Sequence, residues 1–148
     1  MQPIDILILS NGPGEVTTWV RPIVKHLRQQ LSFDVAKVRI SVVLSPCGHA
    51  MGTEADVVRN YPEVDRVQAP EYFFPFLLQG KTAENWDWRE QGIVLFLGGD
   101  QFFCVVIGKR LGYRTVIYAE REARWPRWID RYGAKSKFVQ TEIASRYQ

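Results

Sequence analysis

The feature that most constrains the fold is a short apolar run that leads into a glycine-rich turn and then into an amphipathic helix. Residues 4–9 are isoleucine or leucine apart from Asp5, as in a strand that is buried on both faces of a sheet. The run breaks at Asn11-Gly12-Pro13-Gly14, because glycine permits positive φ angles and proline fixes its own. From Val16 to Leu31 apolar residues then recur at three- and four-residue steps. Strand, turn and helix form the first half of a βαβ unit.

The rest of the chain continues this alternation of strands and helices. Apolar or β-branched runs predict further strands at Val38–Leu44, Val64–Val67, Ile93–Leu97, Thr115–Ala119 and Lys137–Gln140. Periodic segments predict helices at Thr53–Asn60, capped by Thr53, and at Gln101–Leu111, ended by Gly112. The alternation indicates an α/β fold with a doubly wound, mostly parallel, Rossmann-like sheet in a single domain over residues 1–148.

The very apolar segment Tyr72–Leu78 has two interpretations, because Pro75 argues against a central strand. It is either a loop or helical segment packed into the core, or a hydrophobic surface that meets a lipid or a partner domain. The polar stretch Gln79–Glu90, with Trp86 and Trp88, is expected to be a loop.

The glycine-rich turn has three interpretations. In open α/β sheets the ligand approaches the carboxyl ends of the strands, so Asn11, Gly12 and Gly14 are candidate binding residues. A helix N-terminus favours phosphate, but the dinucleotide fingerprint needs a third glycine where this chain has Thr17, and Glu15 would repel a phosphate. The other two interpretations are a turn that shapes a site for a neutral, sugar-like ligand and a turn that only leads the chain from strand to helix.

Two carboxylates follow other expected strands at the same edge. Asp100, after Gly99, could act as a general base or bind sugar hydroxyls, and it also suits the N-cap of the next helix. Glu120 begins a segment rich in arginine and tryptophan, in which Arg124 could pair with phosphate and Trp125 could stack on a sugar. The alternative for this segment is a solvated charged loop with a tryptophan packed into the core.

Composition narrows the class of protein. Of 148 residues, 46% are hydrophobic and 24% charged, as in an ordinary globular domain. Cys47 and Cys104 form no C-x-x-C motif and are expected to be buried, and with only two histidines no zinc site is predicted. No signal peptide or membrane-spanning run is visible, which predicts a cytoplasmic protein. Nine basic against three acidic residues between Lys109 and Lys137 indicate an anionic partner: a phospholipid surface, a phosphorylated substrate or nucleic acid.

Taken together, these motifs resemble the N-terminal half of lipid-A-disaccharide synthase, and most closely the cyanobacterial lipid-A-disaccharide synthase-related proteins. The resemblance rests on the turn that ends at Glu15, on Gly98-Gly99-Asp100, on the segment that leads to Tyr118 and on the following turn rich in tryptophan and arginine. In the family, a second turn after the first glycine-rich one carries two aspartates, and Asp100 matches the second of them. Tyr118 matches a tyrosine of the family's following segment, and Trp125 matches one of the tryptophans in the turn after it. The chain lacks the first aspartate of the second turn and has Glu120-Arg121-Glu122 in place of a Ser-Pro turn.

The resemblance implies a GT-B glycosyltransferase, built from two Rossmann-like domains, that acts with inversion at the inner membrane surface. This chain would be the acceptor-binding half, peripheral to the membrane, and would bind a lipid-linked sugar acceptor. A UDP-sugar donor would bind to a C-terminal domain that the chain lacks, and no cofactor or metal of its own is implied, so the chain alone would be inactive. Asp100 would be the general base, while Glu15, Glu120 and Arg124 would orient sugar or phosphate groups.

Two other functions compete with this interpretation. One is a stand-alone Rossmann-like module that binds a nucleotide or lipid without catalysis. The other is a nucleic-acid-binding domain that uses the basic segment, but the chain carries no recognised reader motif, so nucleic acid is not an expected partner.

Overall fold

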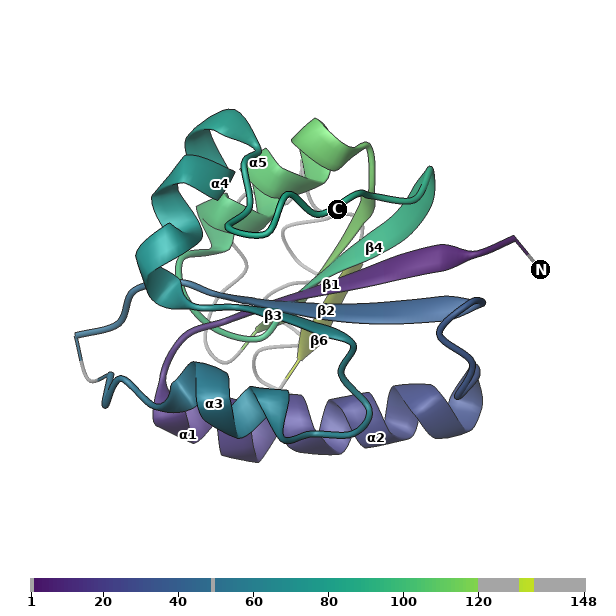
Figure 1. The fold of residues 1–148 in the computed structure, drawn as a ribbon, viewed down its shortest axis with the longest axis horizontal. Helices are drawn as coiled ribbons and strands as arrows, with labels where there is room; N and C mark the ends of the chain where they lie inside the picture. The colour runs from purple at the N-terminus through teal and green to yellow at the C-terminus, as the bar shows by residue number, and fades with distance from the viewer. Residues whose placement is uncertain (1, 49, 120–130, 135–148) are drawn as a thin grey trace.

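The computed structural model describes residues 2–48, 50–119 and 131–134, which form an α/β domain around one sheet (Figure 1). All neighbouring strands in this sheet pair in parallel. The strands are β1 (Ile4–Ser10), β2 (Val38–Leu44), β3 (Arg66–Gln68), β4 (Gln91–Phe96), β5 (Arg114–Ala119) and β6 (Arg131–Ala134). The helices are α1 (Pro13–Glu15), the π-helix η1 (Val16–Val20), α2 (Arg21–Gln30), α3 (Glu54–Arg59), the 3-10 helix η2 (Pro70–Tyr72), α4 (Phe73–Gln79) and α5 (Gln101–Leu111).

The strand order places the two halves of the sheet on either side of β1. The described strands run β3-β2-β1-β4-β5-β6, so the direction of winding reverses between β1 and β4. Helices α1, α2 and α3 cover one face, and α4 and α5 cover the other (Figure 1). This arrangement confirms the predicted doubly wound parallel sheet and is Rossmann-like, because the same order occurs in dinucleotide-binding folds.

Burial on both faces explains why β1 is apolar almost throughout. Leu7 and Leu9 belong to the core beneath α4 and α5, whereas Ile6 and Ile8 belong to the core beneath α1, α2 and α3. Alternate side chains of a strand point to opposite faces, so a strand between two helical layers needs apolar residues at nearly every position.

Several elements differ from the sequence prediction. The first helix starts earlier, at Pro13, and passes through a π-helical segment before α2. The third strand lies at Arg66–Gln68 rather than Val64–Val67. Strand β6 was not predicted, and the strand expected at Lys137–Gln140 lies outside the described residues.

The cap of α3 also differs from the prediction. Thr53 occupies the N-cap position but makes no side-chain cap hydrogen bond. Instead, the buried carboxylate of Glu54 accepts hydrogen bonds from the backbone N–H groups of Met51 and Gly52, at 2.6 and 3.1 Å. A carboxylate in the first turn accepts the backbone N–H groups of the loop that leads into the helix, and its negative charge also suits the positive end of the helix dipole.

The segment Tyr72–Leu78 confirms the interpretation as a helical segment packed into the core, whereas a lipid or partner domain as its contact stays a prediction. It forms α4 after a 3-10 turn, and Phe73, Phe76 and Leu77 are buried in the core. Phe74 and Leu78 point outward, with exposed fractions of 51% and 69%. The helix therefore anchors itself with one face and presents apolar side chains with the other.

A buried ion network at the amino end of β1 attaches the loop between α4 and β4 to the sheet. This loop was expected at Gln79–Glu90, but Gln79 is the last residue of α4. The carboxylate of Asp5, which is fully buried, accepts hydrogen bonds from Arg39 Nε at 2.6 Å and Nη2 at 2.9 Å, from the Arg89 backbone N–H at 2.7 Å and from the Tyr113 hydroxyl at 3.1 Å. Burial alone would raise the pKa of Asp5, but the hydrogen bonds from Arg39 and Arg89 outweigh it and hold that pKa below its usual range. Arg66 lies over the Trp86 ring, 4.5 Å from its centroid, and closes the network from the β3 side.

Candidate functional site

The loops that follow β1 and β4 meet at the carboxyl edge of the sheet, where the strand order reverses. We refer to them as the switch-point loops, residues 11–15 and 97–100. The Leu97 backbone N–H donates to the Leu9 carbonyl at 2.8 Å, which holds the second loop beside the end of β1. In open α/β sheets this position outside the strand ends is where ligands bind.

Side chains from the first switch-point loop occupy the space beside Gly12 and Gly98. A methyl group at Gly98 would lie 2.7 Å from Asn11 Oδ1 and 3.1 Å from Glu15 Cγ. A methyl group at Gly12 would lie 2.5 Å from Glu15 Oε2. These short distances show that the half-buried Glu15 side chain is packed between the two loops.

The first switch-point loop is held mainly by its own side chains. Asn11 Oδ1 accepts the Gly12 backbone N–H at 2.8 Å, and the helix beginning at Pro13 has no side-chain cap. Gly14 is exposed, and a methyl group there would meet no atom within 4 Å. The amide and carboxylate of this loop are therefore acceptors beside a helix start, an arrangement that suits hydroxyl or ammonium groups better than phosphate.

The second switch-point loop ends in the N-cap of α5. Asp100 is exposed, and its Oδ1 accepts the Phe102 backbone N–H at 2.9 Å, which confirms the capping interpretation. Gly99, with φ of 107°, precedes it in a conformation that favours glycine. Asp100 thus stands at the same edge as Asn11 and Glu15, on a helix start that fixes its backbone.

The loop after β2 also reaches this edge, which the sequence analysis missed. Cys47 Sγ lies 3.4 Å from the position of a methyl group at Gly12, and Ser45 Oγ lies 2.8 Å from one at Gly99. Cys104 is buried as expected, whereas Cys47 is only half-buried. The available signal was the Ser45-Pro46-Cys47-Gly48 turn after a buried strand, but its relevance depends on β2 lying next to β1.

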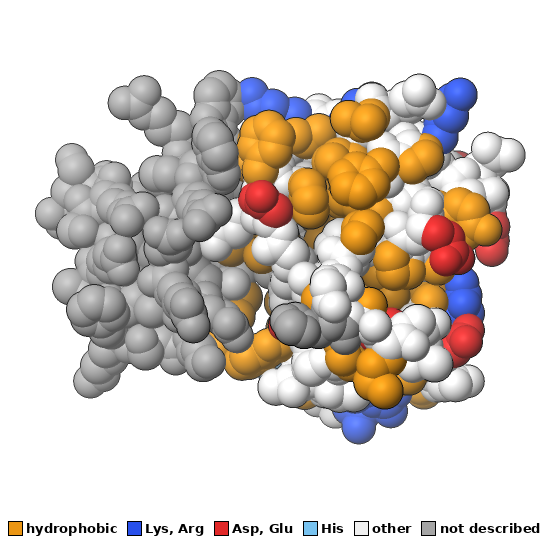
Figure 2. All heavy atoms as spheres, turned by 90° about the vertical axis from the view of Figure 1, so that its left-hand side faces the viewer, with side chains coloured by type: hydrophobic (Ala, Val, Ile, Leu, Met, Phe, Trp, Pro, Cys, Tyr) orange, Lys and Arg blue, Asp and Glu red, His pale blue; other side chains and the backbone are white. Residues whose placement is uncertain are grey.

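An apolar patch begins beside the second switch-point loop, at Phe102, and extends along α4 to Leu78, whose carbonyl accepts a hydrogen bond from Arg110 near the end of α5. We use this name for Tyr72, Phe74, Leu78 and Phe102, whose exposed fractions lie between 44% and 69%. Figure 2 faces the carboxyl edge and shows apolar side chains gathered where α4 and α5 lie. The two helix starts are held together by Phe73 and Phe103, with ring centroids 4.7 Å apart. Asp100 caps α5 by accepting the backbone N–H of Phe102, so the polar end of the second switch-point loop and the apolar patch lie within three residues of each other.

The remaining predicted site residues have different outcomes. Glu120, Arg124 and Trp125 lie outside the described residues. Tyr118, at the end of β5, packs against Trp19 of η1 with ring centroids 4.9 Å apart. In the described part of the chain no group of three or more His, Cys, Asp and Glu side chains could hold a metal ion. None of the helices in that part has the length and apolar character that crossing a membrane requires.

Comparison with known proteins adds no relative. No protein-family model, curated protein or solved structure matches the chain.

Proposed function

We propose that this domain binds a lipid-linked sugar at the switch-point loops and serves as the acceptor half of a glycosyltransferase resembling lipid-A-disaccharide synthase. The observation that carries the proposal is the junction of two surfaces. Carboxylate and amide oxygens of Asn11, Glu15 and Asp100 lie at the carboxyl edge, and the apolar patch begins two residues further on, at Phe102. A sugar joined to acyl chains carries the same two chemistries side by side.

The proposed reaction assigns Asp100 as the general base. Its carboxylate would accept the proton of the acceptor hydroxyl while that oxygen forms a bond to the anomeric carbon of a UDP-sugar. The bond from that carbon to the diphosphate would break, and UDP would leave with the bonding electrons, which inverts the configuration. The exposure of Asp100 supports this role because the base must reach substrate, and capping through Oδ1 orients the carboxylate.

Glu15 and Asn11 would bind the sugar of the acceptor. Hydroxyl groups donate readily to carboxylate and amide oxygens, and both side chains lie between the switch-point loops. The donor would bind to a second domain, so the chain by itself is proposed to bind acceptor without turnover. The apolar patch would face the acyl chains at the surface of an anionic membrane, to which the protein would attach peripherally.

A second candidate is a stand-alone nucleotide-binding module, which the strand order favours. The loop residues oppose it. Thr17 stands in place of the third glycine of the dinucleotide fingerprint, and the Glu15 carboxylate lies where it would repel phosphate.

The test compares a ligand that has both a sugar and acyl chains with ligands that have only one of the two. Calorimetry should show saturable binding of a diacylated glucosamine in detergent micelles and much weaker binding of glucosamine or of micelles alone. Glu15→Gln should weaken this binding roughly tenfold, because a hydrogen bond to a charged group contributes about 1.5–3 kcal/mol and one to the neutral amide only about 0.5–1.5 kcal/mol. Glu90→Gln, on an exposed residue just before β4, is the matched control and should leave it unchanged.

The same titration distinguishes the two candidates. No binding of the acylated sugar, or equal binding to the Glu15→Gln variant, would contradict the acceptor proposal. Low-micromolar binding of UDP or NAD by the chain alone would instead support the nucleotide-binding module.

A further inference from the structure

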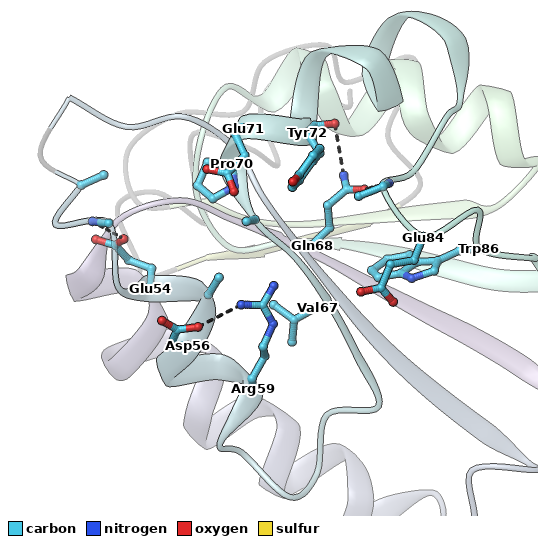
Figure 3. Close-up of a pocket in the computed structure, with 15 residues that line it drawn as sticks. Glu54, Asp56, Arg59, Val67, Gln68, Pro70, Glu71, Tyr72, Glu84 and Trp86 are labelled. Carbon is cyan, nitrogen blue, oxygen red and sulfur yellow. Dashed lines mark hydrogen bonds and ion pairs between the residues drawn. The ribbon is translucent and has the colours of Figure 1, made fainter.

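A cavity lies away from the switch-point loops, along the outer edge of the sheet. It has a volume of about 460 Å³, within the range of roughly 300–1,000 Å³ that small-molecule sites occupy. Its walls come from α3, from the segment between Val67 and Tyr72, and from the loop that holds Glu84 and Trp86 (Figure 3). None of the candidate residues of the switch-point loops lines it.

Hydrogen bonds and ring contacts hold the walls of this cavity in place. The buried Gln68 side chain donates from Nε2 to the Tyr72 carbonyl at 3.4 Å and accepts the Ala83 N–H with Oε1 at 3.0 Å, so it joins two walls. The Trp86 backbone N–H donates to Thr82 Oγ1 at 2.6 Å, and the Arg66 guanidinium fixes the Trp86 ring from the sheet side. The cavity is therefore preformed, which lowers the entropy that a ligand must overcome on binding.

The charged side chains around the cavity are mostly negative. Carboxylates come from Glu54, Asp56, Glu71 and Glu84, against the single guanidinium of Arg59. Arg59 pairs with Asp56 at 3.0 Å, so its charge is already matched (Figure 3). Glu54 is buried and already accepts the backbone N–H groups of Met51 and Gly52, so the exposed carboxylates of Glu71 and Glu84 are the ones left to attract a cation.

The neutral part of the lining decides which kind of cation fits. Val67, Ala55 and Pro70 supply apolar contacts, and Tyr72 and Trp86 supply aromatic rings. Such walls suit an aliphatic stem, while the rings and carboxylates suit a positively charged end. A bare metal ion is a poorer match, since no described group of side chains has the arrangement to hold one.

We propose that this cavity binds a small organic polyamine, with its ammonium groups toward the carboxylates and its methylene chain along the apolar wall. The cavity shares Tyr72 with the apolar patch but is lined by none of residues 11–15 and 97–100. Spermidine binding and acylated-sugar binding are measured separately, so either proposal can fail without the other.

Calorimetry and amide NMR with spermidine test the proposal. Saturable binding should shift the resonances of Ala83 and Trp86 and should weaken with added salt. Glu71 and Glu84 are exposed, so Glu71→Gln and Glu84→Gln should preserve the fold and each weaken binding about two- to fivefold. Arg59→Gln should act in the opposite direction and strengthen binding, because it removes the cation of the lining.

Two controls make the result decisive. Glu90→Gln, outside this cavity, should leave spermidine binding unchanged. Cadaverine should bind, and its neutral counterpart 1,5-pentanediol should not. Equal binding of diamine and diol, an equal loss in Glu90→Gln, or the absence of saturable spermidine binding would overturn the proposal.

Discussion

Replacing Asp5 by asparagine should destabilise the domain strongly, although the two side chains have the same shape. Asp5 is fully buried and accepts four hydrogen bonds, two of them from the Arg39 guanidinium. The substitution removes the charge that compensates Arg39 and, at 3.9 Å, Arg66. Removing one partner of a buried ion pair costs about 3–5 kcal/mol, because the other charge stays buried and unmatched.

This loss is a large fraction of the total stability. A domain of this size has a free energy of unfolding of about 5–15 kcal/mol. At about 2–4 °C per kcal/mol, the loss should lower the melting temperature of Asp5→Asn by roughly 6–20 °C. Urea denaturation followed by circular dichroism would measure the change. Asp87→Asn is the matched control: Asp87 also pairs with Arg39, at 3.1 Å, but its side chain is 80% exposed, and its loss should cost under about 1 kcal/mol.

The effect of Asp5→Asn should also depend on pH. The pKa of Asp5 is lower in the folded state than in the unfolded state, so its contribution is complete above the unfolded value of about 3.9 and is lost as pH falls through the folded value. The difference between wild type and variant should therefore be constant near neutral pH and shrink below about pH 4. A loss below 1 kcal/mol, or an equal loss in Asp87→Asn, would refute this account of the network.

Three further predictions concern the helices. Gly108→Ala should lower the free energy of unfolding by about 1–3 kcal/mol, because its methyl group would overlap the Thr115 side chain on β5. Gly14 faces open space, so Gly14→Ala is the control and should change that free energy by under about 1 kcal/mol. Thermal melts would measure both. Asp100→Asn should preserve stability in the same melts, since asparagine caps equally well, but in the proposed two-domain enzyme it should lower kcat by on the order of a hundredfold. Near-normal turnover would remove Asp100 from the proposed mechanism. The double variant Phe74→Ser/Leu78→Ser should reduce co-sedimentation with anionic vesicles about tenfold or more. Phe33 is 73% exposed on the loop after α2, and the control Phe33→Ser should not reduce it. Equal losses in the two variants would argue against the apolar patch as the lipid-facing surface.

Local patterns predicted the elements that are mostly apolar or clearly capped. Strand β2 has the predicted bounds, as does helix α5, whose Gly112 adopts the left-handed C-cap conformation. Strand β6 gave no such signal, because Arg131–Ala134 has a charged residue, a glycine and no apolar run. It is a strand through its pairing with β5, a contact that sequence periodicity does not encode.

Long-range contacts explain the other features that the sequence did not reveal. Asp5 stands in an apolar run as an apparent exception, and its partners Arg39 and Tyr113 lie 34 and 108 residues away. Cys47 and Ser45 reach the switch-point loops only because β2 lies beside β1. Each residue was visible in the sequence, but its role depends on the strand order, which local propensity does not determine.

The loops, rather than the strand order, decide what the carboxyl edge can accept. The order β3-β2-β1-β4-β5-β6 is shared with domains that place a pyrophosphate at the first helix N-terminus. Here Asn11 Oδ1 already accepts the Gly12 N–H, and the Glu15 side chain fills the space between Gly12 and Gly98. A phosphate would have to displace Asn11 Oδ1 from the Gly12 N–H and would also approach the Glu15 carboxylate, and both steps are unfavourable. A hydroxyl-bearing ligand would meet the same oxygens as a hydrogen-bond donor, so the residues that oppose a nucleotide are the ones on which the proposed sugar site rests.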